Sequence, residues 1–309
     1  MQGGSPEIIR CPPKRVSEAL SLVLNDIAPS QRREIAGALL DVDDRSDLSN
    51  EPLYVALRGG RLCGAAWGQR QFGNTAVFWP PQLVGDEDDQ TACRLAEKVV
   101  RNLDDTAIEM TQVLSPSYAS EVARVLKHVD FRHLADLLYL TCESERFPPE
   151  PPMPCELTFV TCEGSLQPRF TQLIERTYEG TLDCTALNGV RNVENVITGY
   201  QATGLFRPAN WLLVRAGDED VGILLLADHP QAGHWELMYM GLVPEARGHG
   251  WGRQITRYAQ WLARRAAVER IVLAVDAANE PALQMYRSSG FEIWDRRTVY
   301  VRFPANTPA

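Results

Sequence analysis

The stretch from residue 235 to residue 257 constrains the fold of this chain more than any other stretch does. Its first part, residues 237–243, is apolar and has the character of a buried strand, which Pro244 ends because proline cannot donate to a sheet ladder. The residues RGHGWG follow at 247–252, and behind them apolar side chains recur at helical spacing. A strand, a glycine-rich loop and a helix in this order predict an anion site, because loop N–H groups converge beside the positive end of the helix dipole. The expected ligand is a phosphate or a pyrophosphate, with Arg247 adding positive charge.

The composition narrows the class of protein. The 309 residues are enough for two domains, and 45% apolar with 23% charged residues is ordinary for a soluble globular chain. The net charge of −9 argues against a nucleic-acid binder, which usually carries a basic domain or stripe, and it tolerates a cationic amine as substrate. Seven scattered cysteines without a C-x-x-C pair predict free thiols in a reducing compartment and no metal site.

The sequence also carries expectations about location. No apolar run reaches the length of a membrane span, and the first residues lack the basic region and apolar core of a secretory signal. We therefore expect a cytoplasmic protein without a membrane or nucleic-acid partner. The oligomeric state stays open.

The two halves of the chain repeat one order of elements. In the first half the patterns predict a strand at 7–10, helices at 16–27 and 31–40, a Gly-Gly hairpin of strands 53–57 and 62–67, a strand at 76–79 ended by Pro80-Pro81, a helix at 91–103, a strand at 106–114, a helix at 118–128 and a strand at 134–140. In the second half they predict a strand at 157–160, helices at 166–178 and 193–203, a hairpin of strands 211–215 and 221–227, the strand, loop and helix described above, a strand at 270–275, a helix at 281–288 and a strand at 292–302.

Two short matches set the register between the halves. Cys63-Gly64 follows the first hairpin turn and Val221-Gly222 follows the second, 158 residues later. HVDF at 128–131 and SSGF at 288–291 precede the last strand of each half, 160 residues apart. Nearly equal offsets indicate a tandem repeat of one domain.

Alternating strands and helices with a hairpin in each half predict an α/β fold with a mixed sheet. The segment 143–154 contains five prolines, so it reads as a semi-rigid linker. We expect one domain at residues 1–145, the linker at 146–154 and a second domain at 155–309.

The second half resembles the GNAT superfamily of acyl-CoA-dependent N-acyltransferases. The pyrophosphate loop of that family, Arg/Gln-x-x-Gly-x-Gly/Ala, stands here at residues 247–252, and its later segment Asn-x-x-Ala-x-x-x-Tyr stands at 279–286 as NEPALQMY. Gly290-Phe291 before the last strand is also typical. The resemblance covers residues 156 to about 303, and the tandem arrangement is similar to that of mycothiol synthase-like proteins, although no residue points to their substrate.

The first half departs from the family pattern. At the position of the glycine loop it has GDEDD at 85–89, whose four carboxylates would repel a pyrophosphate. The register also places Leu126 where the second half has Tyr286. We expect two tandem GNAT-like domains, of which the N-terminal one is a degenerate copy that contributes an interface or covers the substrate cleft.

The resemblance implies acetyl-CoA, or another acyl-CoA, as co-substrate. Its pyrophosphate would be held by loop N–H groups, while a tight strand–helix turn is the alternative explanation of the glycines. In this family the strand before the loop splays from its neighbour and pairs with the pantetheine arm, and a backbone N–H near Leu242 is the expected oxyanion donor. The expected cofactor contacts are Met240, Leu242, Val243, Arg247, Gly248, His249, Gly250, Trp251, Gly252 and Asn279. Of these, His249 also fits an exposed filler, Trp251 a packing residue and Asn279 a helix cap.

Acyl transfer to an amine also needs a proton donor and a proton acceptor. By the resemblance Tyr286 would protonate the departing thiolate, since a phenol is protonated at neutral pH; simple packing is the alternative. The resemblance implies a catalytic glutamate on this strand six residues before Leu242, which makes Glu236 the candidate general base. Even spacing would place it on one face with Met238, Met240 and Leu242. A solvated carboxylate, with proton removal through waters, remains open.

Two further carboxylates could hold the acceptor. Glu179 and Asp183 lie in the loop after the helix at 166–178, which borders the acceptor cleft in this fold, and they would attract an ammonium group. An ordinary polar loop is the other interpretation. The expected reaction is direct attack by the amine of a small molecule or peptide in a ternary complex, without a metal. The alternatives are a non-catalytic acyl-CoA-binding or regulatory module and a transferase for a longer acyl group.

Overall fold

The computed structural model describes residues 5–25, 27, 51–116, 120–152, 156–162 and 167–304. The predicted helix at 31–40 lies outside these ranges. The chain forms two compact units, unit 1 with Met1–His133 and Val299–Ala309, and unit 2 with Leu134–Thr298. We describe each unit by itself.

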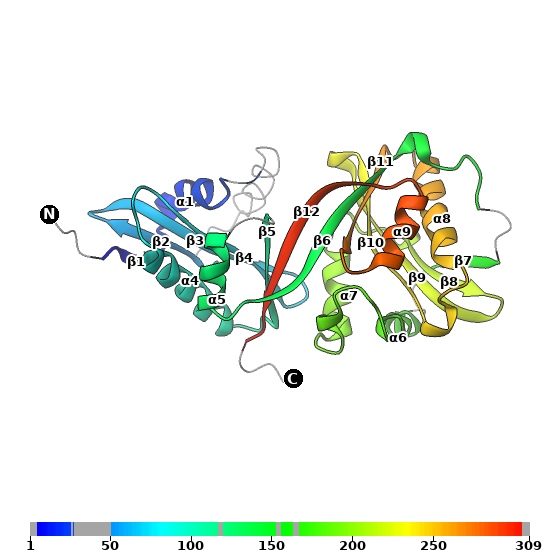
Figure 1. Cartoon of the computed structure of the whole chain (residues 1–309), viewed down its shortest axis with the longest axis horizontal. Helices are drawn as coiled ribbons and strands as arrows, with labels where there is room; N and C mark the ends of the chain where they lie inside the picture. Colours follow the sequence, from blue (N-terminus) through cyan, green and yellow to red (C-terminus); the bar gives the residue numbers. More distant parts are fainter. Residues whose placement is uncertain are drawn as a thin grey trace. The chain divides into compact units, whose positions relative to one another are not determined.

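Unit 1 is built on a sheet with the strand order β1-β2-β3-β4-β5 (Figure 1). Its elements are β1 (Glu7–Arg10), η1 (Pro13–Arg15), α1 (Val16–Val23), β2 (Leu53–Arg58), β3 (Arg61–Gln71), β4 (Thr75–Leu83), α4 (Asp89–Asp104), β5 (Met110–Pro116) and α5 (Ser120–His128). The first four strands are antiparallel neighbours, and β5 pairs with β4 in parallel. The sheet is therefore mixed, as the hairpin predicted.

Unit 2 repeats this architecture with the strand order β6-β11-β10-β9-β8-β7. Its strands are β6 (Arg132–Glu143), β7 (Leu157–Thr161), β8 (Trp211–Ala216), β9 (Glu219–His229), β10 (His234–Leu242), β11 (Arg270–Asp276) and β12 (Glu292–Arg302), which lies beside β6. Its helices are α6 (Gln167–Tyr178), α7 (Val193–Gln201), α8 (Trp251–Arg265) and α9 (Glu280–Ser288), with short 3-10 turns η2 (Ser144–Arg146), η4 (Thr185–Leu187), η5 (Pro208–Asn210), η6 (Pro230–Ala232) and η7 (Pro244–Ala246). Strands β10 and β11 are parallel, and the other pairs among β6–β11 are antiparallel.

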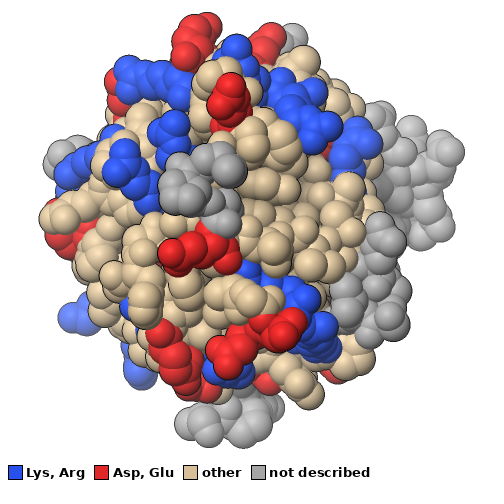
Figure 2. Space-filling view, turned by 90° about the vertical axis from the view of Figure 1, so that its right-hand side faces the viewer, with Lys and Arg blue, Asp and Glu red and all other residues tan. Residues whose placement is uncertain are grey.

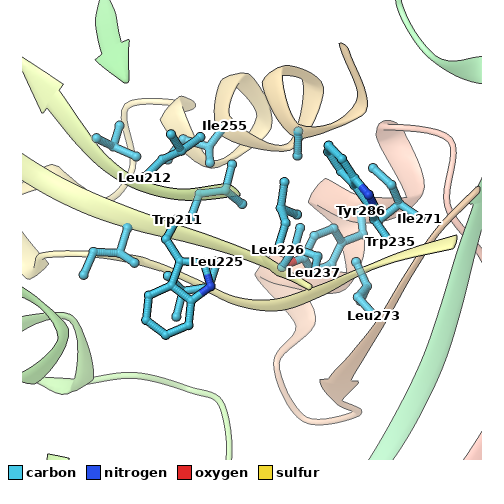
Figure 3. Packing of buried hydrophobic residues seen from close by; sticks show 14 of the residues in the cluster. Trp211, Leu212, Leu225, Leu226, Trp235, Leu237, Ile255, Ile271, Leu273 and Tyr286 are labelled. Carbon is cyan, nitrogen blue, oxygen red and sulfur yellow. The ribbon is translucent and has the colours of Figure 1, made fainter. Parts of the chain in front are cut away.

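The helices of unit 2 cover both faces of its sheet. Met240 of β10 contacts the hydroxyl of Thr256 on α8, whereas a Cβ on the next residue, Gly241, would meet Thr177 of α6 at 2.7 Å. Successive strand residues point to opposite faces, so α8 and α6 lie on opposite sides. The buried residues labelled in Figure 3, among them Ile255 and Tyr286, form the core against β8–β11.

The predicted even alternation along β10 is wrong for Glu236. Glu236 and Met240 pair with β9 residues that are three positions apart, so their side chains point to opposite faces. The cause is a β-bulge between Leu237 and Tyr239, which inserts one residue and reverses the facing beyond it. Glu236 shares a face with Tyr239 and Gly241 instead.

A second difference concerns the prolines at positions 80 and 81. They were expected to end their strand, but β4 continues to Leu83. The ladder steps from the pair Trp67–Trp79 to the pair Ala65–Gln82, so both prolines fall within an irregularity of the pairing. Bulges tolerate proline because the missing N–H leaves no ladder bond unmade.

The two units repeat each other at the hairpin glycines. Gly64 pairs with Leu83 at the end of β4, and Gly222 pairs with Leu242 at the end of β10. A Cβ on either glycine would lie 2.8 Å from the Cδ2 atom of that leucine. At Gly222 a Cβ would also lie 2.5 Å from the carbonyl oxygen of Gly241, so this position needs glycine, whereas at Gly64 only leucine side chains would have to move.

The ends of α5 and α9 repeat as well. The N–H of Phe131 donates to the carbonyl of Leu126 at 3.0 Å, and the N–H of Phe291 donates to that of Tyr286 at 3.1 Å. These matching bonds place Leu126 and Tyr286 at equivalent positions, in agreement with the register of the sequence.

The compact units do not divide at the proline-rich segment. The strand predicted at 134–140 belongs to unit 2, because β6 pairs with β11 from Leu137 opposite Asp276 to Glu143 opposite Arg270. The boundary expected from the sequence, with a linker at 146–154 between domains at 1–145 and 155–309, stays a prediction.

The surface of unit 2 mixes both signs of charge. On the face drawn in Figure 2, described Lys and Arg side chains alternate with Asp and Glu side chains around an uncharged area. Among the described residues, no helix is both long and apolar enough to cross a membrane.

Candidate active site

A cavity of about 520 Å³ opens in unit 2 where β10 and β11 diverge. The parallel pairing joins His234–Glu236 to Arg270–Val272, after which β10 runs on to Leu242 and β11 to Asp276. The facing edges of the two strands, including Met240 and Ala274, line the cavity. Backbone groups on such edges can bind a ligand that extends between the strands.

The glycine loop forms one end of the cavity. Gly248 and Gly250 have φ angles of +82° and +76°, a left-handed conformation that favours glycine. Gly250 is the N-cap of α8, whose first N–H groups have no acceptor within the helix and carry the positive end of its dipole. A Cβ at either glycine would meet nothing within 4 Å, so the space beside the loop is open to a ligand.

The residues between and after the loop glycines differ in their exposure and in their contacts. His249 is exposed, and its ring stacks on that of Trp251 at 4.9 Å between centroids. The Trp251 indole donates to Glu156 at 3.3 Å and also lines the cavity, as does Gly252. The exposed Arg253 contributes a cationic side chain to the cavity wall.

Arg247 is a structural clamp within this wall. Its guanidinium donates to the carbonyls of Leu242 at 3.1 Å, Gly180 at 2.9 Å and Thr177 at 3.0 Å. It thus ties the end of β10 to the last turn of α6 and the loop behind it. The sequence suggested a source of charge and gave no sign of these three contacts.

Tyr286 lies in the cavity wall on α9 and is only 6% exposed. Burial, with a smaller contribution from the charge of Asp183, holds the pKa of its phenol well above the ordinary value. The ring also packs edge-to-face on Phe291 at 5.5 Å between centroids, a contact that the packing interpretation expects. Asn279 caps α9 by accepting the N–H of Ala282 at 3.3 Å, and it lines the cavity as well.

Asp183 lines the cavity in a reciprocal contact with Asp276. An oxygen of Asp183 accepts the N–H of Asp276 at 2.8 Å, and an oxygen of Asp276 accepts the N–H of Cys184 at 3.1 Å. Desolvation by the surrounding protein raises the pKa of Asp183, while the N–H of Asp276 lowers it and the charge of Asp276 raises it. Sequence reasoning missed Asp276, because only the fold brings residues 183 and 276 together.

Four of the predicted site residues do not line the cavity. Val243 is buried, with its N–H donating to Val221 at 3.0 Å, and Glu179 is exposed beyond α6. His249 is exposed at the loop, as described above. Glu236 points to the other face of the sheet, where its carboxylate lies 3.0 Å from Nε2 of His229.

Comparison with known proteins supports the interpretation of this region. Residues 177–291 match the acetyltransferase (GNAT) family. A mycothiol acetyltransferase of Pseudarthrobacter chlorophenolicus is 34% identical over 100 residues, which is 31% of each chain. Another from Thermobifida fusca is 38% identical over 69 residues, 22% of this chain and 21% of that protein. The similar segments thus span about a third or less of these relatives.

Two solved structures share the fold over nearly the whole chain. A GCN5-related N-acetyltransferase from Sphaerobacter thermophilus has a TM-score of 0.67 at 17% identity, covering 99% of this chain and 98% of its own. A tandem GNAT protein from the clavulanic acid biosynthesis pathway has a TM-score of 0.56 at 13% identity, covering 98% and 99%. Such low identities show the fold alone. Residues 177–291 thus match the acetyltransferase (GNAT) family, and the fold of the chain is that of two GNAT-like domains in tandem.

Proposed function

We propose that this chain is an acetyl-CoA-dependent N-acetyltransferase, and that unit 2 transfers the acetyl group to the amine of a small molecule or peptide. The observation that carries the proposal is the cavity between the diverging strands β10 and β11. It connects the open glycine loop at the start of α8 with the phenol of Tyr286 on α9. The cavity thus offers an anion site and a proton donor to one extended ligand.

The residues of the cavity fit acetyl-CoA. Gly248, Gly250 and the first N–H groups of α8 would hold the pyrophosphate, with Arg253 as the cation facing it. Met240 and Leu242 would hold the pantetheine arm along the free edge of β10. Bound there, acetyl-CoA supplies an activated acyl group, and every other step falls to residues of the chain.

Tyr286 would donate its proton to the departing thiolate. Its raised pKa keeps the phenol protonated throughout the neutral range, which is the form that a general acid needs. A backbone N–H of β10 near Leu242 would donate to the oxyanion that forms on the acyl carbon. Asn279 would help to orient the ligand from the start of α9.

Proton removal from the amine is assigned to Glu236, directly or through water. Glu236 is the last β10 residue in register with β11, so it lies at the point where the gap between the strands begins. Asp183 in the cavity wall and Glu179 in the same loop would attract the ammonium form of the acceptor.

Unit 1 is proposed to bind no acetyl-CoA. The N-cap of α4 is Asp88, at the position that Gly250 holds on α8, and its carboxylate accepts the N–H of Thr91 at 2.9 Å. Glu87 beside it is paired with Arg58 at 2.7 Å. Carboxylates thus stand where a pyrophosphate would have to bind, which predicts one acetyl-CoA per chain.

The test is thiol release from acetyl-CoA across a panel of amines. We expect turnover by the wild type and a loss of about 10²-fold or more in kcat for Tyr286→Phe, with little change in acetyl-CoA affinity. Tyr258→Phe, on α8 outside the cavity wall, is the matched control. Acetyl-CoA binding without turnover of any amine would identify a non-catalytic acyl-CoA-binding module instead.

A further inference from the structure

Beyond the cavity, three strands of unit 2 present a row of side chains on the sheet face opposite α8. Glu236 is in register with Val272, and Tyr139 of β6 is in register with Ala274. Val272 and Ala274 are two residues apart on β11, so Glu236, Ala274 and Tyr139 point to the same side. Ala274 is exposed on this face and also lines the cavity, which links the row to the gap between the strands.

An exposed indole extends this row. The side chain of Trp294 on β12 is 57% exposed, and its ring meets that of Tyr139 edge-to-face with 5.9 Å between centroids. Burial raises the pKa of Tyr139 to about 12, and the charges of Arg297, Glu236 and Asp295 act on the same phenol. Arg297 and Asp295 pair with each other at 2.8 Å, whereas the carboxylate of Glu236 lies 3.0 Å from Nε2 of His229.

From this arrangement we propose that the aromatic pair Tyr139–Trp294 is the acceptor subsite of unit 2 and selects a small primary amine that carries an apolar or aromatic ring. The ring lies against the exposed face of Trp294, and the ammonium group lies toward Glu236. This inference rests on the proposed function, since it names the substrate class of the same site.

The chemistry of the cluster favours this class over a linear amine. A large exposed indole binds the face of a ring and attracts a nearby cation through its π system. Glu236 adds the full negative charge that an ammonium group requires, and the adjacent opening at Ala274 is where the acyl group would be reached. A linear amine would satisfy the carboxylate but leave the aromatic surface uncovered.

The experiment compares 2-phenylethylamine with n-butylamine as acceptors for the full chain, using thiol release. We expect the wild type to favour 2-phenylethylamine in kcat/KM, and Trp294→Ala to reduce that preference about tenfold, with the KM for acetyl-CoA unchanged. Trp294→Phe retains a ring and should keep most of the preference. Ile293→Ala, an exposed apolar neighbour on the same strand, should keep all of it.

The outcomes separate the two proposals. If Trp294→Ala keeps the wild-type preference, or if the wild type turns over both amines equally, the ring subsite is refuted while the acetyltransferase stands. A wild type that turns over n-butylamine but not 2-phenylethylamine refutes it as well. Failure of the wild type to bind acetyl-CoA would refute the proposed function itself.

Discussion

Gly250 is the residue at which backbone conformation and ligand binding can be separated most clearly. Its φ of +76° lies in the left-handed region, where a residue with a Cβ costs about 1–2 kcal/mol. A Cβ at this position would meet nothing within 4 Å, so no clash adds to that cost in Gly250→Ala. Gly252, two residues on in the first turn of α8, has no positive φ, and its Cβ would lie 4.0 Å from Cγ of Met285. Alanine there should stabilise the helix by about 0.5–1 kcal/mol.

The two alanine variants should therefore differ by about 2 kcal/mol in the free energy of unfolding, measured by urea titration of the full chain. Equal stabilities would show that the left-handed conformation of Gly250 is not required, and the account of the loop would be wrong. Gly250→Val fills the space beside the loop and should abolish acetyl-CoA binding in isothermal titration calorimetry. Binding that persists with the wild-type stoichiometry would place the ligand elsewhere, and retention of half the sites would show that unit 1 also binds it.

Two further predictions follow from single contacts. Gly241→Ala would bring a Cβ to 2.6 Å from the Tyr239 hydroxyl and 2.7 Å from Cβ of Thr177. We therefore expect a loss of about 2–3 kcal/mol in the free energy of unfolding. A loss below about 0.5 kcal/mol would contradict the close approach of α6 and β10. Asp88 has a lowered pKa because it accepts hydrogen bonds from Thr91, so its contribution to stability is present above the unfolded-state pKa and is lost as the pH falls through the folded-state value. Asp88→Ala should therefore lower the melting temperature at pH 7, and the difference from the wild type should shrink toward pH 2; a difference that does not vary with pH would refute the capping role.

Much of the fold could be predicted because the signals for its elements are local. The Gly59-Gly60 turn, the strand before residue 247 and the Pro281 start of α9 each depend on a few neighbouring residues, and the structure has an element at each place. The bulge in β10 was beyond sequence reasoning, since nothing in residues 237–239 distinguishes an inserted residue from a regular strand. Its consequence is large, because it moves Glu236 to the opposite face from Met240.

The candidate site shows the same division between local and distant information. The glycine loop was predicted because its own glycines favour the backbone conformation that the loop adopts. The clamp formed by Arg247 and the contact of Asp183 with Asp276 instead join segments 67 or more residues apart. Such contacts depend on how α6 and its loop return to the sheet. No spacing rule within one segment could indicate them.

The duplication explains why unit 1 has the diverging strands of the site but carboxylates in place of its glycine loop. Strands β4 and β5 pair in parallel over Thr75–Val77 and Met110–Gln112 and then extend beyond the paired stretch, as β10 and β11 do. This divergence is set by the sheet, so it survives changes in loop sequence. The anion site instead depends on a few residues at one helix N-terminus, and a single side chain, Asp88 in place of Gly250, accepts one of the helix N–H groups, that of Thr91. The proposed absence of an acetyl-CoA site in unit 1 therefore requires a change at the helix cap alone, while the strands that would flank the ligand remain in place.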